Sequence, residues 1–201
     1  MSVFVVGLLF GLSIAAPVGP MALLSISRTL QQGWAFGIAT GLGIATGDAF
    51  YGTLAGFGFS AATNLLISYA GPLRVVGGLF LVWLGVSFWR KADQPPEARA
   101  QRRQYGLGRS YLVAVGLTLT NPATILIFIA AFSALDLAGR TGGGTWLVAG
   151  VFLGSAGWWI GLCSVIALLR RALTPTLMRW IDRLSAAVLV GFGAAAAAGL
   201  L

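Results

Sequence analysis

The chain has 201 residues, of which 58% are hydrophobic and 9% are charged, and its mean hydropathy is +0.89. Soluble domains carry about 25% charged residues, so this composition excludes an ordinary soluble protein and indicates a polytopic helical membrane protein. The net charge of +8 rests on only 13 Lys and Arg residues that cluster in a few loops, which favours membrane orientation over nucleic-acid binding. No histidine occurs and Cys163 is the single cysteine, which excludes an internal disulfide and removes the commonest transition-metal ligand.

The first apolar stretch, residues 3–26, is interrupted by two prolines. Pro17 removes a helical hydrogen bond, Pro20 repeats the damage one turn later, and Gly19 lies between them. In lipid, freed backbone groups are tolerated only where protein or a water-filled cavity satisfies them, so the break should face the inside of a bundle. A proline kink without function is the simpler alternative. No basic segment precedes the stretch, which favours an uncleaved first span over a secretory signal.

Five further spans are expected, at residues 34–57, 62–89, 110–133, 145–169 and 181–201, which makes six in all. The segment between the third and fourth spans is polar and contains the Pro95-Pro96 pair. The sequence therefore predicts an all-α membrane protein with a first three-helix repeat over residues 1–90, a basic linker over 91–109 and a second three-helix repeat over 110–201.

The basic residues sort by loop in this six-span scheme. Eleven of the thirteen fall in the first, third and fifth loops, and the exceptions are Arg74 and Arg140. Arg28 is the basic residue assigned to the first loop. The positive-inside rule then places these loops and the 91–109 linker in the cytoplasm and both termini outside.

An internal repeat relates the two halves. Gly11-Leu-Ser-Ile-Ala-Ala-Pro17 aligns without gaps on Gly116-Leu-Thr-Leu-Thr-Asn-Pro122, so that glycine, leucine, a small hydroxyl and proline recur at the same spacing. Three spans per half make the second half enter the membrane from the opposite face, which predicts inverted repeats with discontinuous helices in the first and fourth spans. Paired broken segments indicate the substrate site of a transporter. A chance match of seven apolar residues is the alternative.

The breaks supply the candidate substrate-binding residues. Half-helix N-termini at such breaks carry partial positive charge that suits a carboxylate. Ser13 and Thr118 each stand four residues before a proline, where a hydroxyl can compensate the backbone, so we assign them a supporting structural role. The candidates at the breaks themselves are Pro17, Gly19, Pro20, Asn121 and Pro122.

Asp48 is the acidic residue expected well inside a span. It follows Trp34 by 14 residues, or about 21 Å at 1.5 Å per residue. A carboxylate near the bilayer centre costs about 2.5–3.5 kcal/mol, which makes it a functional hypothesis by default. It could bind a substrate ammonium group, carry a coupling proton, or do both in alternation; the alternative is an aspartate that binds backbone freed by the breaks. The matching region of the second half, taken as residues 157–159, has no acid, so the halves are functionally unequal.

Four short motifs are distributed in order along the chain. They are Pro17-Val-Gly-Pro20, Gly43-x-x-x-Gly47-Asp48, Leu84-Gly85 near the end of the third span, and Asn121-Pro122 in the fourth. In this order and spacing the chain resembles the lysine exporter (LysE/RhtB) family of bacterial amino-acid exporters. Val18 within the first motif and Ala123 after the last depart from the family's usual pattern, which leaves the substrate open.

The resemblance implies a secondary-active exporter of amino acids or related small zwitterions in the bacterial inner membrane, driven by proton antiport. Its partners would be the amino acid, protons and the lipid bilayer, with no cofactor and no nucleic acid, and a homodimer is left open. An enzyme is disfavoured because the sequence has neither a cysteine pair nor a nucleophile–base constellation. The alternative is a metal-ion exporter of the same wider superfamily, where the absence of histidine favours hard cations.

Overall fold

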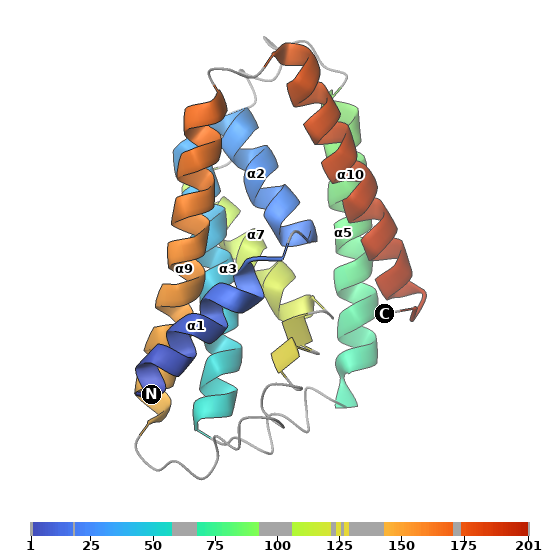
Figure 1. The fold of residues 1–201 in the computed structure, drawn as a ribbon. Coiled ribbons are helices and arrows are strands. Elements are labelled where there is room, and N and C mark those ends of the chain that lie inside the picture. Colours follow the sequence, from blue (N-terminus) through green and yellow to red (C-terminus); the bar gives the residue numbers. More distant parts are fainter. Residues whose placement is uncertain are drawn as a thin grey trace.

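The computed structural model describes residues 2–17, 19–57, 68–92, 106–121, 124–125, 127–128, 143–170 and 174–200. Within these ranges all regular secondary structure is helical, which confirms the predicted all-α fold (Figure 1). The named helices are α1 (Val3–Ala15), α2 (Pro20–Gln32), α3 (Trp34–Gly56), α5 (Ala70–Ala92), α7 (Leu107–Thr120), α9 (Gly144–Leu169) and α10 (Pro175–Ala197).

The first predicted span consists of two helices. The α1 and α2 helices meet at a 76° bend, and Gly19 caps the N-terminus of α2 with an extended backbone. Pro20 is the first helical residue, where a missing N–H costs nothing because that group has no helical partner. The α2 helix runs six residues beyond the predicted end at 26, so the assignment of Arg28 to a loop is wrong. It stops at Gly33, whose φ of +101° favours glycine.

A second break occurs in the fourth predicted span. The α7 helix ends at Thr120, and Asn121 is extended with φ −76° and ψ 114°, as expected for a residue that precedes a proline. The backbone is helical again at residues 124–125. Pro122 lies outside the described residues. Both segments with matched prolines are therefore interrupted helices.

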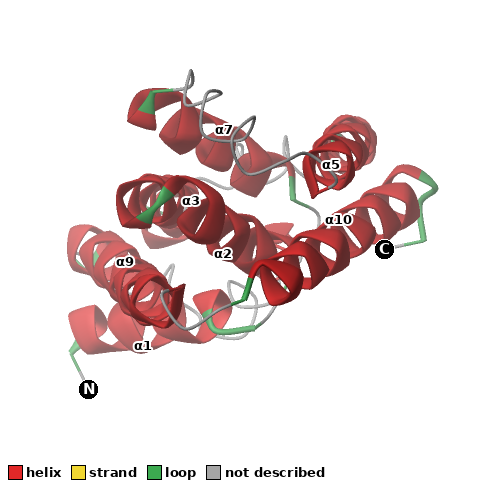
Figure 2. Cartoon of the chain, turned by 90° about the horizontal axis from the view of Figure 1, so that it is seen from above, coloured by secondary structure: helices red, strands yellow, loops and turns green. Residues whose placement is uncertain are grey.

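The helices form two groups that α2 connects. In the larger group α1 packs along α9, α9 along α3, and α3 along α7, whereas α5 and α10 form a second group, in which α5 also contacts α7 (Figures 1 and 2). The α2 helix contacts α3 and α9 on one side and α10 on the other. In the predicted repeat, α1 of the first half corresponds to α7 of the second, and α3 corresponds to α9. The contact of α1 with α9 therefore corresponds to the contact of α7 with α3, and both contacts are present.

Glycines let α1 and α9 approach at backbone distance. A Cβ atom on Gly11 would collide with the carbonyl oxygen of Val151, and one on Gly154 would collide with that of Leu8. Small residues at such contacts are the usual means by which membrane helices pack closely, because lipid offers no hydrophobic drive for association. The α1 segment before the break is therefore held firmly against α9.

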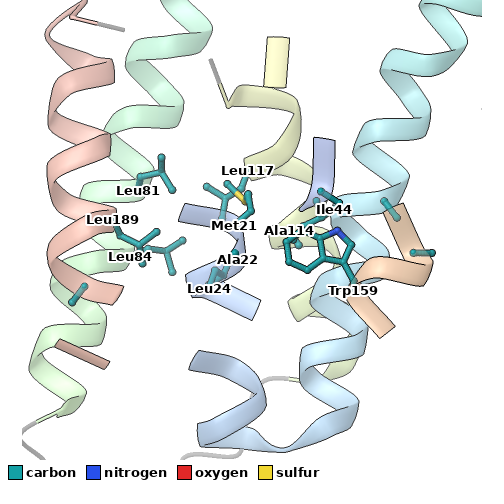
Figure 3. Close-up of a cluster of buried hydrophobic side chains, with 14 residues drawn as sticks. Met21, Ala22, Leu24, Ile44, Leu81, Leu84, Ala114, Leu117, Trp159 and Leu189 are labelled. Carbon is teal, nitrogen blue, oxygen red and sulfur yellow. The ribbon is translucent and has the colours of Figure 1, made fainter. Parts of the chain in front are cut away.

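Apolar side chains fill the space around α2. Figure 3 shows Met21, Ala22 and Leu24 of α2 between residues of α5 and α10 on one side and residues of α3, α7 and α9 on the other. Large apolar side chains also point outward, among them Leu112 at 67% exposure, as lipid-facing residues do. The residues facing α2 in this cluster include Leu81, Leu84, Leu189, Ile44, Ala114, Leu117 and Trp159.

Length and hydropathy identify fewer spans than the sequence predicts. Among the described helices, Gly144–Leu169 and Arg179–Ala197 are long and apolar enough to cross a membrane, and α1 with α2 makes a third if the bent pair is one span. The six-span count stays a prediction, because several predicted spans extend into ranges outside the described residues.

Candidate functional site

A chain of hydrogen bonds ends on the buried carboxylate of Asp48 in the middle of α3. Ser155 Oγ on α9 donates to Asp48 Oδ2 at 2.7 Å. Trp159 Nε1, one turn further along α9, donates to Ser155 Oγ at 3.2 Å. Asp48 is only 4% exposed, so the α3–α9 contact excludes most solvent from it. The Trp159 N–H thus orients the Ser155 hydroxyl toward the carboxylate.

The carboxylate keeps acceptor capacity beyond the bond from Ser155. Within the described part of the chain, no basic side chain forms an ion pair with Asp48. An ionised carboxylate offers about four lone-pair positions, and a buried one without a cation is costly. The arrangement therefore suits a group that arrives from outside the protein, either a proton or a cationic ligand.

The end of α7 lies beside the same part of α3. Tyr51, one turn beyond Asp48, donates its hydroxyl to the carbonyl oxygen of Leu119 at 2.7 Å. Gly47 packs against the side chain of Thr118, which a Cβ atom would approach to 2.6 Å. The second helix break follows within three residues of these contacts, so it lies beside the stretch of α3 that carries Asp48.

The first helix break reaches the same region through apolar contacts. Ala15 at the end of α1 and Met21 at the start of α2 belong to a buried cluster that also contains Ala45 and Ala156. Ala45 lies three residues before Asp48, and Ala156 directly follows the hydroxyl donor on α9. The end of α1 and the start of α2 therefore share one buried cluster with residues next to Asp48 and Ser155.

The predicted residues of the first break have unequal environments. Pro20 is buried, Gly19 is partly buried, and Pro17 is exposed. Ser13 is exposed, and its hydroxyl donates to the carbonyl oxygen of Leu9 at 2.7 Å, which is a bond within its own helix.

The predicted residues of the second break are buried where they are described. Thr118 is fully buried and donates to the carbonyl oxygen of Ala114 at 2.9 Å. Asn121 is 6% exposed and caps α7, with its backbone N–H bonded to the Thr118 carbonyl. Pro122 lies outside the described residues. Thr118 is thus brought against Gly47, the residue before Asp48, from the other half of the chain.

Ser155 is a site residue that the sequence reasoning missed. The sequence analysis predicts residues 157–159 as the counterpart of Asp48, but the residue bonded to Asp48 is Ser155. A signal exists, because Gly150-Val-Phe-Leu-Gly154-Ser155 repeats the spacing of Gly43-Ile-Ala-Thr-Gly47-Asp48. The acid therefore pairs with the residue at the matching place of the second half.

A second buried acid was also missed. Asp182 on α10 is 2% exposed and accepts hydrogen bonds from Ser27 Oγ at 3.0 Å and Gln31 Nε2 at 2.8 Å. Asp48 is therefore not the only acidic residue inside the helices. The signal lay in α2, where Ser27 and Gln31 stand four residues apart and share one face.

Metal-ligating side chains do not cluster in the described ranges. No group of three or more His, Cys, Asp or Glu residues is found there that could hold a metal ion. Cys163 is buried, with its Sγ 3.2 Å from Ser25 Oγ.

Comparisons with known proteins agree on a family. A family model described as LysE type translocator matches residues 12–199. The uncharacterized membrane protein YahN of Escherichia coli (strain K12) is 32% identical over 73% of this chain and 68% of its own length. The threonine efflux protein of the same strain is 30% identical over 76% of each chain.

A further relative is matched over a shorter stretch. The homoserine/homoserine lactone efflux protein of Salmonella typhimurium is 28% identical over 57% of this chain and 55% of its own length. No solved structure matches the chain.

Proposed function

Because the chain belongs to the LysE type translocator family, we propose that it exports amino acids or related small zwitterions across the bacterial inner membrane by proton antiport. The names of two relatives, threonine efflux protein and homoserine/homoserine lactone efflux protein, support this substrate class. Proton coupling, which the resemblance also implies, rests here on the chemistry of Asp48.

The observation that carries the proposal is the environment of Asp48. Its carboxylate is buried beside two helix breaks, receives one hydroxyl bond from Ser155, and has no cationic partner among the described residues. Such a group is stabilised either by a proton or by a substrate ammonium group. Alternate occupation by these two cations would couple proton entry to substrate exit.

The N-terminus of α2 is our proposed site for the substrate carboxylate. Gly19 caps the helix without a side-chain bond, and Pro20 has no N–H. The backbone amides of Met21 and Ala22 are then the first donors of the helix, and the helix dipole adds partial positive charge there. At the second break, we propose that Asn121 at the end of α7 is the polar residue that binds the substrate.

Membrane topology is part of the same proposal. We place residues 1–90 and 110–201 as two inverted repeats, with the 91–109 linker in the cytoplasm and both termini outside. Reporter fusions at Arg99 and Pro175 should be cytoplasmic, and a fusion after Leu201 should be external. A cytoplasmic reporter after Leu201 would contradict the inverted repeat without touching the family assignment.

Efflux from loaded vesicles tests the export proposal directly. Purified protein is reconstituted into liposomes that contain labelled threonine, homoserine, lysine or leucine, and release is followed with and without an imposed pH gradient. We expect release of at least one amino acid, accelerated by a gradient that drives protons in the opposite direction. Release that ignores the gradient would refute proton coupling while leaving export intact.

The metal-exporter alternative is separated by a second assay. A strain that lacks its own amino-acid exporters is transformed with the gene. It is then grown with dipeptides, whose hydrolysis raises the amino-acid concentration inside the cell to toxic levels, and separately with divalent metal salts. Protection against the amino acids alone supports the proposal. Protection against metals alone would replace it.

A further inference from the structure

We infer that Arg28 forms a second anion-binding site, which takes the carboxylate of the exported zwitterion at the basic end of the helix bundle. This inference rests on the proposed export function. It adds a substrate-binding site that is distinct from the helix breaks and from Asp48.

Arg28 is a buried cation where three helices meet. It lies in the second half of α2, is 8% exposed, and uses Nη1 for both of its hydrogen bonds. One goes to Thr40 Oγ1 on α3 at 3.1 Å and the other to the carbonyl oxygen of Ser110 on α7 at 2.9 Å. A guanidinium carries five N–H donors in a rigid fork, so these two bonds leave donors for another acceptor.

The charge of Arg28 is not balanced by its neighbours. Thr40 and the Ser110 carbonyl are neutral, and no acidic side chain of the described ranges pairs with Arg28. Arg109, the residue before Ser110 on α7, adds electrostatic repulsion. A buried cation beside a second cation calls for an anion, and a planar carboxylate fits a guanidinium fork through two parallel hydrogen bonds.

The position of Arg28 separates it from the Asp48 site. It follows Pro20 by eight residues on α2, and its partner Thr40 precedes Asp48 by eight residues on α3. Eight residues of helix correspond to about 12 Å. Both charged groups of an amino acid are attached to one carbon atom, so one molecule cannot bridge these sites. Arg28 and Asp48 would therefore act one after the other, with Arg28 nearer the basic loops.

A purely structural role is the competing explanation. In that case Arg28 only ties α2 to α3 and α7, and its loss would weaken the binding of every substrate equally. A site for carboxylate predicts a selective loss, because an analogue without that group never used it. The ratio between an amino acid and its amide therefore distinguishes the two roles.

The experiment compares L-threonine with L-threoninamide as competitors of counterflow by the full chain in liposomes. Replacing Arg28→Gln should weaken inhibition by threonine about tenfold or more and change inhibition by threoninamide less than about twofold. Arg179→Gln, which removes an exposed arginine of α10, should change neither compound. An equal loss for both compounds, or an unchanged ratio, would overturn the Arg28 site.

Two further variants keep the test decisive if Arg28→Gln does not fold. Arg28→Lys retains the charge but replaces the fork with a point donor, so the threonine-to-threoninamide preference should fall several-fold without disappearing. Thr40→Val removes one partner of Arg28 and no charge, and the preference should persist. An unchanged preference in Arg28→Lys would contradict the site.

Failure of the proposed function has a different signature. If the unsubstituted chain releases another amino acid of the panel but not threonine, that amino acid and its amide replace threonine and threoninamide in the comparison; if it releases none, the export function is refuted and Arg28 loses its role with it. If the unsubstituted chain prefers threonine and Arg28→Gln retains that preference, only the Arg28 site is refuted.

Discussion

Two aspartates are buried in this protein, and their surroundings differ. Asp182 on α10 accepts bonds from the Ser27 hydroxyl and the Gln31 amide of α2 at 3.0 and 2.8 Å, and it has a further interaction besides these. Asp48 on α3 accepts one bond, from Ser155, in a contact lined by glycine. Burial is nearly the same for both, so burial alone does not distinguish a functional acid from a structural one.

The number of partners distinguishes them. A carboxylate whose acceptor positions are filled by fixed donors ties two helices together and has little capacity for a ligand. Asp182 accepts two bonds from α2 on Oδ1 and has a further interaction, and it joins α10 to α2, the helix between the two groups of the fold (Figure 2). Asp48 accepts one bond, from Ser155, and has no cationic partner among the described residues. We therefore propose that Asp48 serves transport and that Asp182 attaches α2 to α10.

The largest expected effect is on transport by Asp48→Asn. The amide keeps the size of the side chain and its bond to Ser155 but can neither bind a proton nor balance an ammonium group. Gradient-driven export should fall by at least about a hundredfold. Full export by this variant would remove the contrast between the two acids.

Exchange measurements sharpen the Asp48 result. Labelled and unlabelled substrate are exchanged across the vesicle membrane without a gradient. Exchange should survive in Asp48→Asn if the residue only couples protons and should vanish if it also binds the ammonium group.

The next effect is on stability and concerns Asp182→Ala. This change removes the acceptor of the buried Ser27 hydroxyl and one of the two acceptors of the partly buried Gln31 amide, so the free energy of unfolding should drop by about 2–4 kcal/mol. Thermal unfolding of the detergent-purified protein measures this loss. Transport per folded molecule should stay within a few-fold of the parent. Normal stability with abolished transport would place Asp182 in the transport cycle instead.

A smaller loss of stability is expected for Gly11→Ala. The new methyl group meets the Val151 carbonyl one turn before Ser155, so α1 must move away from α9, at a cost of about 1–3 kcal/mol. The matched control is Gly116→Ala at the corresponding place of the repeat, where nothing lies within 4 Å of the added atom. That control should be neutral or slightly stabilising in the same unfolding assay. Equal losses at both positions would contradict the close α1–α9 contact.

The smallest expected effect belongs to Trp159→Phe. Phenylalanine keeps most of the packing but removes the N–H that orients Ser155, so transport should drop a few-fold, in line with about 1 kcal/mol for a neutral hydrogen bond. Trp158→Phe is the control, because Trp158 Nε1 is buried without a hydrogen-bond partner. The two variants are compared by initial rates of efflux. A larger effect from Trp158→Phe would show that the hydrogen bonds from Trp159 through Ser155 to Asp48 are unimportant for transport.

Features that act within one stretch of chain could be predicted from the sequence. The all-α fold follows from long apolar runs, since backbone groups in lipid must bond within their own segment. The end of α1 near Pro17 and the end of α7 before Pro122 follow from the geometry of proline, which acts on its immediate neighbours. Asp48 could be selected because a charge in an apolar run is costly wherever its partners lie.

Features that join separate helices were decided only by the tertiary structure. The partner of Asp48 is 107 residues away, and the partners of Asp182 are more than 150 residues away. The sequence places Arg28 in a loop. In the structure, α2 turns back into the bundle after a 76° bend, and Arg28 is buried against α3 and α7. Apolar patterning states that a helix is buried but not which helix it faces, because in lipid every apolar surface is an equivalent neighbour until close packing and hydrogen bonds select one.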